Sequence, residues 1–159
     1  MKQSHKIAVL LHNIRSVHNV GSIFRTAEAL GLNKIYFSGF TPTPVDRFGR
    51  IRKDFAKVAL GAEQTMSWEV VESEEKIINK LKKENYTVIA LEQNRNSVDY
   101  KKVRINSRAL FVLGNEVDGI SKEILKLCDV IAEIPMSGEK ESLNVSVAFG
   151  IALFRILNI

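Results

Sequence analysis

Three short polar segments hold the side chains that could do chemistry, and each follows an apolar run. They are residues 12–25, 114–119 and 136–144, and they contain two arginines, carboxylates, amides and hydroxyls. In parallel α/β proteins, ligands bind beyond the carboxyl ends of the strands. The three segments could therefore meet at one edge of a sheet although they are remote in sequence.

Taken singly, these residues have simple structural explanations. Arg25 lies opposite the apolar stripe of an expected helix and would face solvent, and Asn19 would cap that helix at its start. Ser142 and Asn144 precede the last apolar run, and Ser and Asn are also preferred capping residues. A helix N-terminus attracts anions, however, so this last turn could equally hold a ligand.

The middle segment, GNEVDG, places two glycines around Glu116 and Asp118. Gly114 permits a tight exit from a strand and a close approach of backbone to a ligand. Two acids could suggest a cation, but no cluster of His or Cys accompanies them, so we expect no metal. The chain has neither the G-x-G-x-x-G nor the G-x-x-x-x-G-K-[ST] motif. Their absence disfavours an ordinary Rossmann dehydrogenase and a P-loop NTPase.

The elements that must position these segments alternate along the chain. Strand and helix patterns follow one another from end to end, which predicts a mostly parallel α/β sheet with helices on both faces. No repeat or linker interrupts the pattern, so we expect one domain over residues 1–159. Six strands are expected at 6–14, 34–38, 66–71, 87–91, 109–113 and 130–134, and helices at 19–30, 73–85, 121–127 and 145–157.

Bulk properties narrow the class of protein. The net charge of +5 permits a polyanionic partner without requiring one. A single cysteine, Cys128, excludes a disulfide framework and favours a reducing, cytoplasmic location. We expect no signal peptide and no membrane span. The last helix is apolar on nearly every face, which predicts that the core or a partner chain covers it.

Together the three segments resemble the three motifs of the SpoU (TrmH-like) family of RNA ribose methyltransferases, within the SPOUT superfamily. The first is NIRSVHNVGSIFRTAEALG, the second FVLGNEVDGIS and the third IPMSGEKESLNVSVAFGIALFRIL. Their order and spacing both fit, and the match covers essentially the whole chain.

The resemblance implies an α/β fold whose C-terminal segment threads through a loop to make a deep trefoil knot. It also implies a homodimer through the first and last helices, and methyl transfer from S-adenosylmethionine to a ribose 2′-hydroxyl of tRNA or rRNA. The family's cofactor-binding positions correspond to Leu91, Gly114, Ile134, Met136 and Leu143.

The family's catalytic positions correspond to Asn19, Arg25, Glu116, Ser142 and Asn144. Arginine is effectively always protonated in proteins. We therefore interpret Arg25 as a donor that stabilises the developing alkoxide, rather than as a base. Glu116 and Asn144 would orient Arg25 and the substrate, and Ser142 would hold the loop.

Many family members carry an additional RNA-binding domain, whereas we expect none here. RNA would then contact basic residues of the domain itself, namely Arg15, Arg47, Arg50, Arg52 and Lys53. A solvated surface explains this basic loop equally well. Two other functions stay open: an RNA-binding module of the same fold without catalysis, and a SPOUT base methyltransferase.

Overall fold

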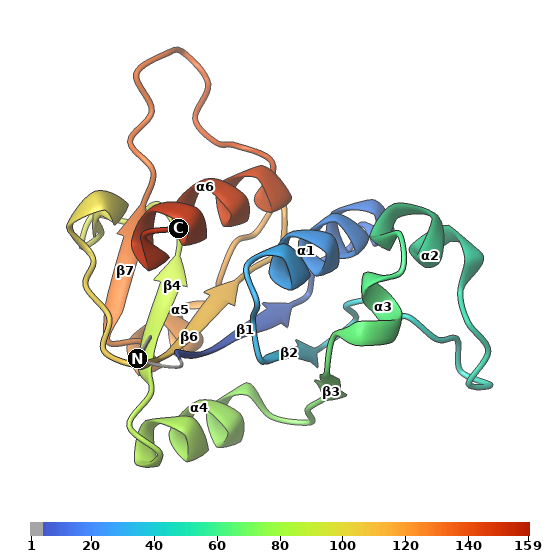
Figure 1. Cartoon of the computed structure of the whole chain (residues 1–159). Helices are drawn as coiled ribbons and strands as arrows, with labels where there is room; N and C mark the ends of the chain where they lie inside the picture. Colours follow the sequence, from blue (N-terminus) through green and yellow to red (C-terminus); the bar gives the residue numbers. More distant parts are fainter. Residues whose placement is uncertain (1–4) are drawn as a thin grey trace.

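The computed structural model describes residues 5–159, and a parallel sheet forms its centre (Figure 1). The sheet has seven strands in the order β3-β2-β1-β6-β4-β7-β5, and every pair is parallel. The predicted parallel α/β class is thus confirmed, with one strand more than expected. The strands are β1 (Lys6–His12), β2 (Lys34–Ser38), β3 (Trp68–Val70), β4 (Thr87–Leu91), β5 (Val98–Asp99), β6 (Arg108–Leu113) and β7 (Val130–Glu133).

Helices cover both faces of the sheet, as the sequence predicts. In β1, the buried side chains of Ile7, Val9 and Leu11 belong to the same core as α1 and α6, whereas those of Ala8 and Leu10 belong to the core of α4 and α5. This alternation is the ordinary two-residue period of a strand. The helices are α1 (Val17–Ala29), α2 (Lys53–Ala59), α3 (Ala62–Thr65), α4 (Glu74–Lys83), the 3₁₀ helix η1 (Tyr100–Lys102), α5 (Lys122–Leu127) and α6 (Val145–Leu157).

The order of the strands reverses next to β1. From β1 the chain moves outward through β2 to β3, and it then returns to the other side of β1 through β4 and β6. The connections leaving β1 and β6 therefore diverge at their carboxyl ends. In open parallel sheets this switch point is where ligands bind.

The two long helices begin differently from one another. Ser16, and not Asn19 as predicted, caps α1, since its Oγ accepts a hydrogen bond from the Asn19 N–H at 3.2 Å. Asn19 lies inside the first turn of α1 and its side chain is only 6% exposed. Asn144 caps α6 by accepting from the N–H groups of Ser146 and Val147.

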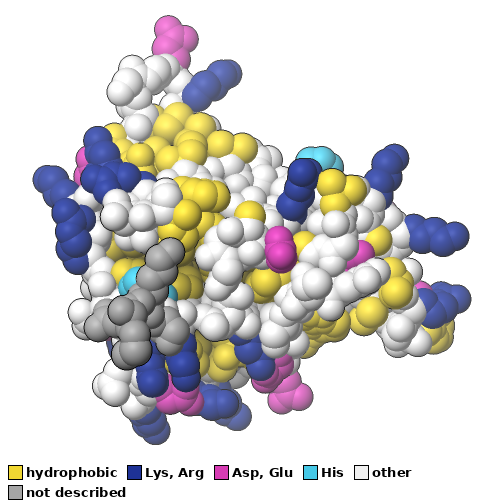
Figure 2. Space-filling model, viewed as in Figure 1, with side chains coloured by type: hydrophobic (Ala, Val, Ile, Leu, Met, Phe, Trp, Pro, Cys, Tyr) yellow, Lys and Arg dark blue, Asp and Glu magenta, His cyan; other side chains and the backbone are white. Residues whose placement is uncertain are grey.

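The apolar surface of α6 is only partly covered. Phe149, Ala152 and Leu153 are fully buried, whereas three other apolar side chains of α6 remain exposed in the single chain. These are Val147 (49% exposed), Ile151 (40%) and Phe154 (41%). Figure 2 shows hydrophobic side chains gathered over α6. Within residues 5–159, no helix is both long enough and apolar enough to cross a membrane.

Candidate active site

The turn that follows β6 is tightly built. Asn115 pairs with Gly119 in both directions through the main chain, and its Oδ1 accepts from the N–H groups of Val117 and Asp118 at 2.9 Å each. A Cβ on Gly114 would lie 2.5 Å from the carbonyl carbon of Gly119. The missing side chain of Gly114 therefore makes room for the backbone of the same turn, at Gly119 and Ile120.

Two residues that sequence reasoning missed fix this turn in place. Asn115 is buried, and its Nδ2 donates to the main-chain carbonyl of Asn13, which follows β1, at 2.8 Å. Glu92, directly after β4, accepts from the Ile120 N–H at 2.9 Å. Asn115 could have been noticed as a turn residue between Gly114 and Glu116, whereas nothing in the sequence marks the contact of Glu92.

The turn presents the Glu116 carboxylate to the start of α1. Its Oε2 accepts from the Arg15 N–H at 3.0 Å, and its Oε1 accepts from the Ser16 N–H at 3.2 Å and from the Asn19 Nδ2 at 3.0 Å. Partial burial opposes ionisation, but the hydrogen bonds from Arg15, Asn19 and Ser16 outweigh it and lower the pKa of Glu116. A carboxylate at a helix N-terminus is also favoured by the helix dipole.

Asn19 connects this carboxylate to the third segment. Its Oδ1 accepts from the Asn144 Nδ2 at 2.9 Å, while its Nδ2 donates to Glu116. Asn144 in turn accepts from the Ser146 hydroxyl at 2.6 Å. Glu116, Asn19 and Asn144, which we call the amide–carboxylate chain, thus join the three polar segments at one place.

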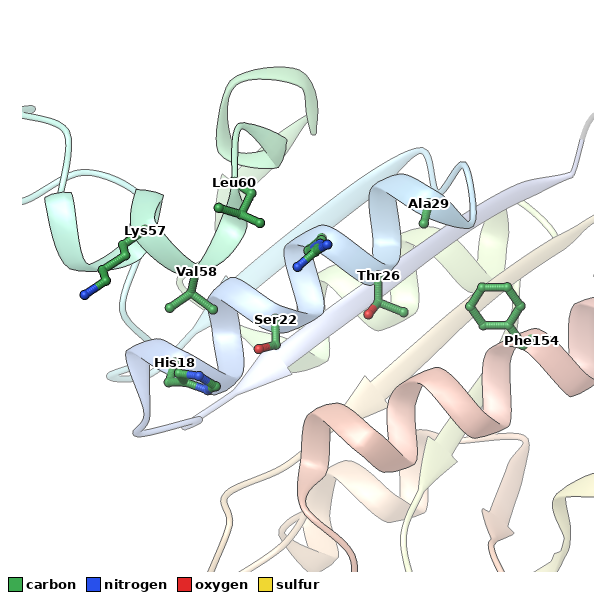
Figure 3. A pocket seen from close by; sticks show the side chains of 9 residues that line it. His18, Ser22, Thr26, Ala29, Lys57, Val58, Leu60 and Phe154 are labelled. Carbon is green, nitrogen blue, oxygen red and sulfur yellow. The ribbon is translucent and has the colours of Figure 1, made fainter.

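Arg25 lies outside the amide–carboxylate chain. Its guanidinium forms none of the hydrogen bonds that connect Glu116, Asn19 and Asn144 within residues 5–159. It instead lines a hollow of about 820 Å³ between α1, α2 and α6. Figure 3 shows His18, Ser22, Thr26 and Ala29 on the α1 side of this hollow, Lys57, Val58 and Leu60 on the α2 side, and Phe154 on α6. We expected all the catalytic positions to lie together, but within the single chain Arg25 is not joined to the others.

Ser142 also stays apart from these contacts. It is exposed, and within residues 5–159 the hydrogen bonds at the start of α6 are made by Asn144 and Ser146 instead. The single chain thus offers no contact through which Ser142 would hold the loop.

Four of the five expected cofactor positions lie at the ends of three neighbouring strands. Leu91 ends β4, Gly114 follows β6, and Ile134 and Met136 follow β7, while Leu143 lies just before α6. Because β6, β4 and β7 are adjacent, the four positions at their ends (Leu91, Gly114, Ile134 and Met136) lie along the carboxyl edge of the sheet.

The chemistry of this edge suits a nucleoside. Residues 135–143 belong to no helix or strand, and in this part of the structure they make no main-chain hydrogen bonds with each other or with other segments. Figure 1 shows them as a long loop beyond α6. Free main-chain donors and acceptors of this loop can form hydrogen bonds with the polar edge of an adenine ring. The apolar side chains of Leu91, Ile134 and Met136 can pack against its flat faces.

The basic positions lie partly beside the amide–carboxylate chain. Arg15, whose N–H binds Glu116, places its guanidinium 5.9 Å from the centre of the Phe40 ring. Arg50 pairs with Asp46 at 2.8 Å and Arg52 with Asp54 at 2.9 Å, while Lys53 is exposed. Arg47 lies over the exposed Phe48 ring.

Comparison with known proteins reveals a family relationship over nearly the whole chain. The family model described as the SpoU rRNA Methylase family matches residues 6–154. The 23S rRNA (guanosine-2'-O-)-methyltransferase RlmB of Neisseria meningitidis is 31% identical over 147 residues, which are 92% of this chain and 56% of that protein. The tRNA (guanosine(18)-2'-O)-methyltransferase of Aquifex aeolicus is 29% identical over 96% of this chain and 69% of its own length.

A solved structure shows the same relationship in three dimensions. The AdoMet-bound rRNA methyltransferase from Sinorhizobium meliloti superimposes with a TM-score of 0.84 at 26% identity, over 96% of this chain and 56% of the other. The chain thus spans little more than half the length of this structure and of the RlmB relative.

Proposed function

The chain belongs to the SpoU rRNA Methylase family, and on that premise we propose that it transfers a methyl group from S-adenosylmethionine to a ribose 2′-hydroxyl of tRNA or rRNA. The observation that carries the proposal is the amide–carboxylate chain of Glu116, Asn19 and Asn144. It joins three remote segments at the strand edge where the cofactor positions lie. Relatives named as rRNA and tRNA 2'-O-methyltransferases support the choice of substrate.

The residues after β4, β6 and β7 fit S-adenosylmethionine. Main-chain groups of the 134–143 loop would bind the adenosine edge, and Leu91, Ile134 and Met136 would cover its faces. When bound, the cofactor would supply the methyl group. The protein's own contribution is to hold the ribose oxygen in line with that group, because alignment can supply much of the rate.

The protonation state of Glu116 assigns it a role. Its two oxygens already accept three hydrogen bonds and its pKa is lowered, so it is a poor proton acceptor. Glu116 would instead hold the start of α1 against the β6 turn, which fixes the position of Asn19. Arg25 remains our proposed donor to the ribose oxygen or to a neighbouring phosphate.

We propose that the protein forms a homodimer through α1 and α6. The support is the exposed apolar stripe of Val147, Ile151 and Phe154, spaced along one face of α6. Phe154 also lines the hollow that holds Arg25. A second copy on this face would therefore lie beside Arg25, and Arg25 of one copy could then serve the amide–carboxylate chain of the other.

We also propose that residues 1–159 act as one domain whose C-terminal segment is threaded as a knot. The support is that β7 pairs with β4 on one side and with β5 on the other. The connection from β4 to β6 thus crosses β7 to reach β5 before it returns, and η1 within it packs against α6. A cytoplasmic location would suit an RNA substrate and a single free cysteine, Cys128.

Incubation of the purified protein with labelled S-adenosylmethionine and unmodified total RNA tests the proposed function. We expect incorporation of label, and nucleoside mass spectrometry should place it on ribose. Label on a base would favour the base-methyltransferase alternative. No incorporation, together with no heat of binding when S-adenosylmethionine is titrated into the protein, would favour the non-catalytic module.

A further inference from the structure

An aromatic side chain lies at the tip of the loop between β2 and α2. Phe48 is 66% exposed, and the earlier Phe40 in the same loop is 55% exposed. A large aromatic ring left in water gives up the stabilisation that burial would bring. Two such rings in one loop therefore suggest that a ligand covers them.

The loop holds Phe48 in this exposed position through its own hydrogen bonds. The Asp46 carboxylate accepts from the N–H groups of Phe48 and Arg50 at 2.8 and 3.0 Å. Gly49 takes a left-handed conformation, with φ of +76°, that lets the chain turn. An antiparallel bridge between Val45 and Ile51 closes the base of the turn. Phe48 is thus presented by an ordered turn.

Guanidinium groups lie close to both exposed rings. The Cζ atoms of Arg47 and Arg50 lie 4.7 and 5.0 Å from the centre of the Phe48 ring. Arg15 lies over Phe40 in the same manner. Figure 2 shows Lys and Arg side chains projecting around the end of the molecule formed by α2 and the loop before it.

Phe40 connects to the proposed active site through short contacts. The Phe40 N–H donates to the Asn13 Oδ1 at 3.1 Å, and Asn13 follows directly on β1. Thr41 fixes the same end of the loop by accepting from the Ile14 N–H at 3.1 Å. Arg15 contacts Phe40 with its guanidinium and Glu116 with its main chain. Phe40 thus lies beside Arg15, which itself contacts Glu116 of the amide–carboxylate chain.

We propose that Phe40 and Phe48, with Arg15, Arg47 and Arg50, form a stacking surface for unpaired bases that flank the methylated nucleotide. This inference rests on the proposed RNA function and adds a choice of substrate class, namely single-stranded over double-stranded RNA. Bases stack on aromatic rings and on guanidinium planes, and only unpaired nucleotides expose the base faces to do so.

The charge of the loop favours RNA over a protein partner as the occupant. Residues 39–57 hold five basic side chains and two acidic ones. An apolar protein surface placed there would bury this excess charge, whereas phosphates would neutralise it. The mixture of arginine and aromatic rings matches what single-stranded nucleic acids bind.

The test compares two variants at each ring. Phe48→Leu keeps an apolar side chain but loses stacking, whereas Phe48→Trp keeps stacking, and Phe40 is treated in the same way. The probes are fluorescein-labelled oligouridylate as a single strand and the same strand hybridised to oligoadenylate, both followed by fluorescence anisotropy. A single-stranded probe containing 2-aminopurine reports stacking, because its emission falls when the base stacks.

We expect each Leu variant to bind the single strand about 10-fold or more weakly, since one stacked base is lost. The Trp variants should bind like the wild type. Duplex binding and the slope of affinity against salt should change in neither, because phosphate contacts set them. Equal binding of Leu and Trp variants, equal wild-type affinity for single strand and duplex, or absence of 2-aminopurine quenching would overturn the proposal.

Failure of this inference is distinguishable from failure of the proposed function. Titration calorimetry with S-adenosylmethionine and methylation of total RNA are measured on the same preparations. A wild type that methylates RNA while its Leu variants bind the single strand normally refutes only the stacking surface. A wild type that neither binds S-adenosylmethionine nor methylates refutes the proposed function, whatever the anisotropy shows.

Discussion

Replacing Glu116 with Gln should weaken the link between the β6 turn and α1. The carboxylate accepts three hydrogen bonds, from the N–H groups of Arg15 and Ser16 and from the Asn19 amide. Glutamine has only one acceptor oxygen. Its NH₂ group would replace the second carboxylate oxygen and would face at least one of these N–H donors. The substitution thus removes the negative charge from the helix N-terminus and leaves at least one donor without its partner.

The size of the effect follows from these contacts. A hydrogen bond to a charged group contributes about 1.5–3 kcal/mol when buried, but Glu116 is exposed enough for water to screen part of this. We expect Glu116→Gln to lower the free energy of unfolding by about 1–2 kcal/mol. At about 2–4 °C per kcal/mol for a domain of this size, Tm should fall by roughly 2–8 °C.

Thermal unfolding followed by circular dichroism, at one fixed protein concentration, measures this loss. Asp118→Asn is the matched control. It also removes one negative charge, only two residues from Glu116, but the Asp118 carboxylate is not part of the amide–carboxylate chain. The control should stay within about 0.5 kcal/mol of the wild type. Equal Tm values for the two variants would refute the reasoning.

The pH dependence gives a second measurement of the same link. The pKa of Glu116 is lowered in the folded protein from its ordinary value of 4.5. A carboxyl with a lowered pKa stabilises the fold above its unfolded pKa, and this stabilisation disappears as pH falls through the folded pKa. The difference between wild type and Glu116→Gln should therefore be full near neutral pH and shrink in acid below 4.5. A difference that stayed constant down to the acid limit would contradict an ionised Glu116.

Four further predictions address other parts of the molecule. Gly114→Ala would place a Cβ 2.5 Å from the Gly119 backbone, so it should lower the free energy of unfolding by about 1–3 kcal/mol and abolish the heat of S-adenosylmethionine binding in calorimetry. Ile151→Glu puts a charge on the exposed stripe of α6, so the protein should elute as a monomer in size-exclusion chromatography with light scattering and lose methylation; a dimer that persisted would refute the proposed interface. Arg25→Lys should lose most of its methylation rate, since lysine cannot reproduce a bidentate donor, and a near-normal rate would exclude that role. Burial, with a contribution from Asp129, raises the pKa of Cys128 to about 12; iodoacetamide should thus modify it far more slowly at pH 8 than a free thiol, and equal rates would contradict this.

The hydrophobic pattern was sufficient to predict most of the sheet. The long apolar runs around Leu10 and Phe111 are buried on both sides, and no other element fits such runs between helical segments. The pattern failed at β5, because Val98 is exposed and the strand has only two residues in a polar connection. That segment is a strand only because it pairs with β7, more than 30 residues later in the chain, and the local sequence cannot predict such a distant pairing.

The amide–carboxylate chain could be predicted only in part. Local rules favour Asn19 and Ser16 alike as caps, whereas in the structure Ser16 caps α1 and Asn19 binds Glu116, 97 residues away. The resemblance to a family supplied the residues, whereas their hydrogen bonds came only from the fold. The separation of Arg25 from Glu116 and Asn144 agrees with the local pattern, which puts Arg25 opposite the apolar stripe of α1 and facing solvent. The family resemblance, by contrast, had grouped it with the other catalytic positions.

The place of β7 between β4 and β5 sets the order in which the sheet can be completed on the ribosome. While residues up to the end of β6 emerge, one edge of β4 has no neighbour and β5 has no strand to pair with. Ile89, Ala90 and Leu91 therefore offer an open hydrophobic edge to other nascent chains until β7 has been synthesised. The vulnerable interval in the biogenesis of this protein is thus the translation of residues 92–133, and slowing synthesis there should increase aggregation more than slowing it earlier.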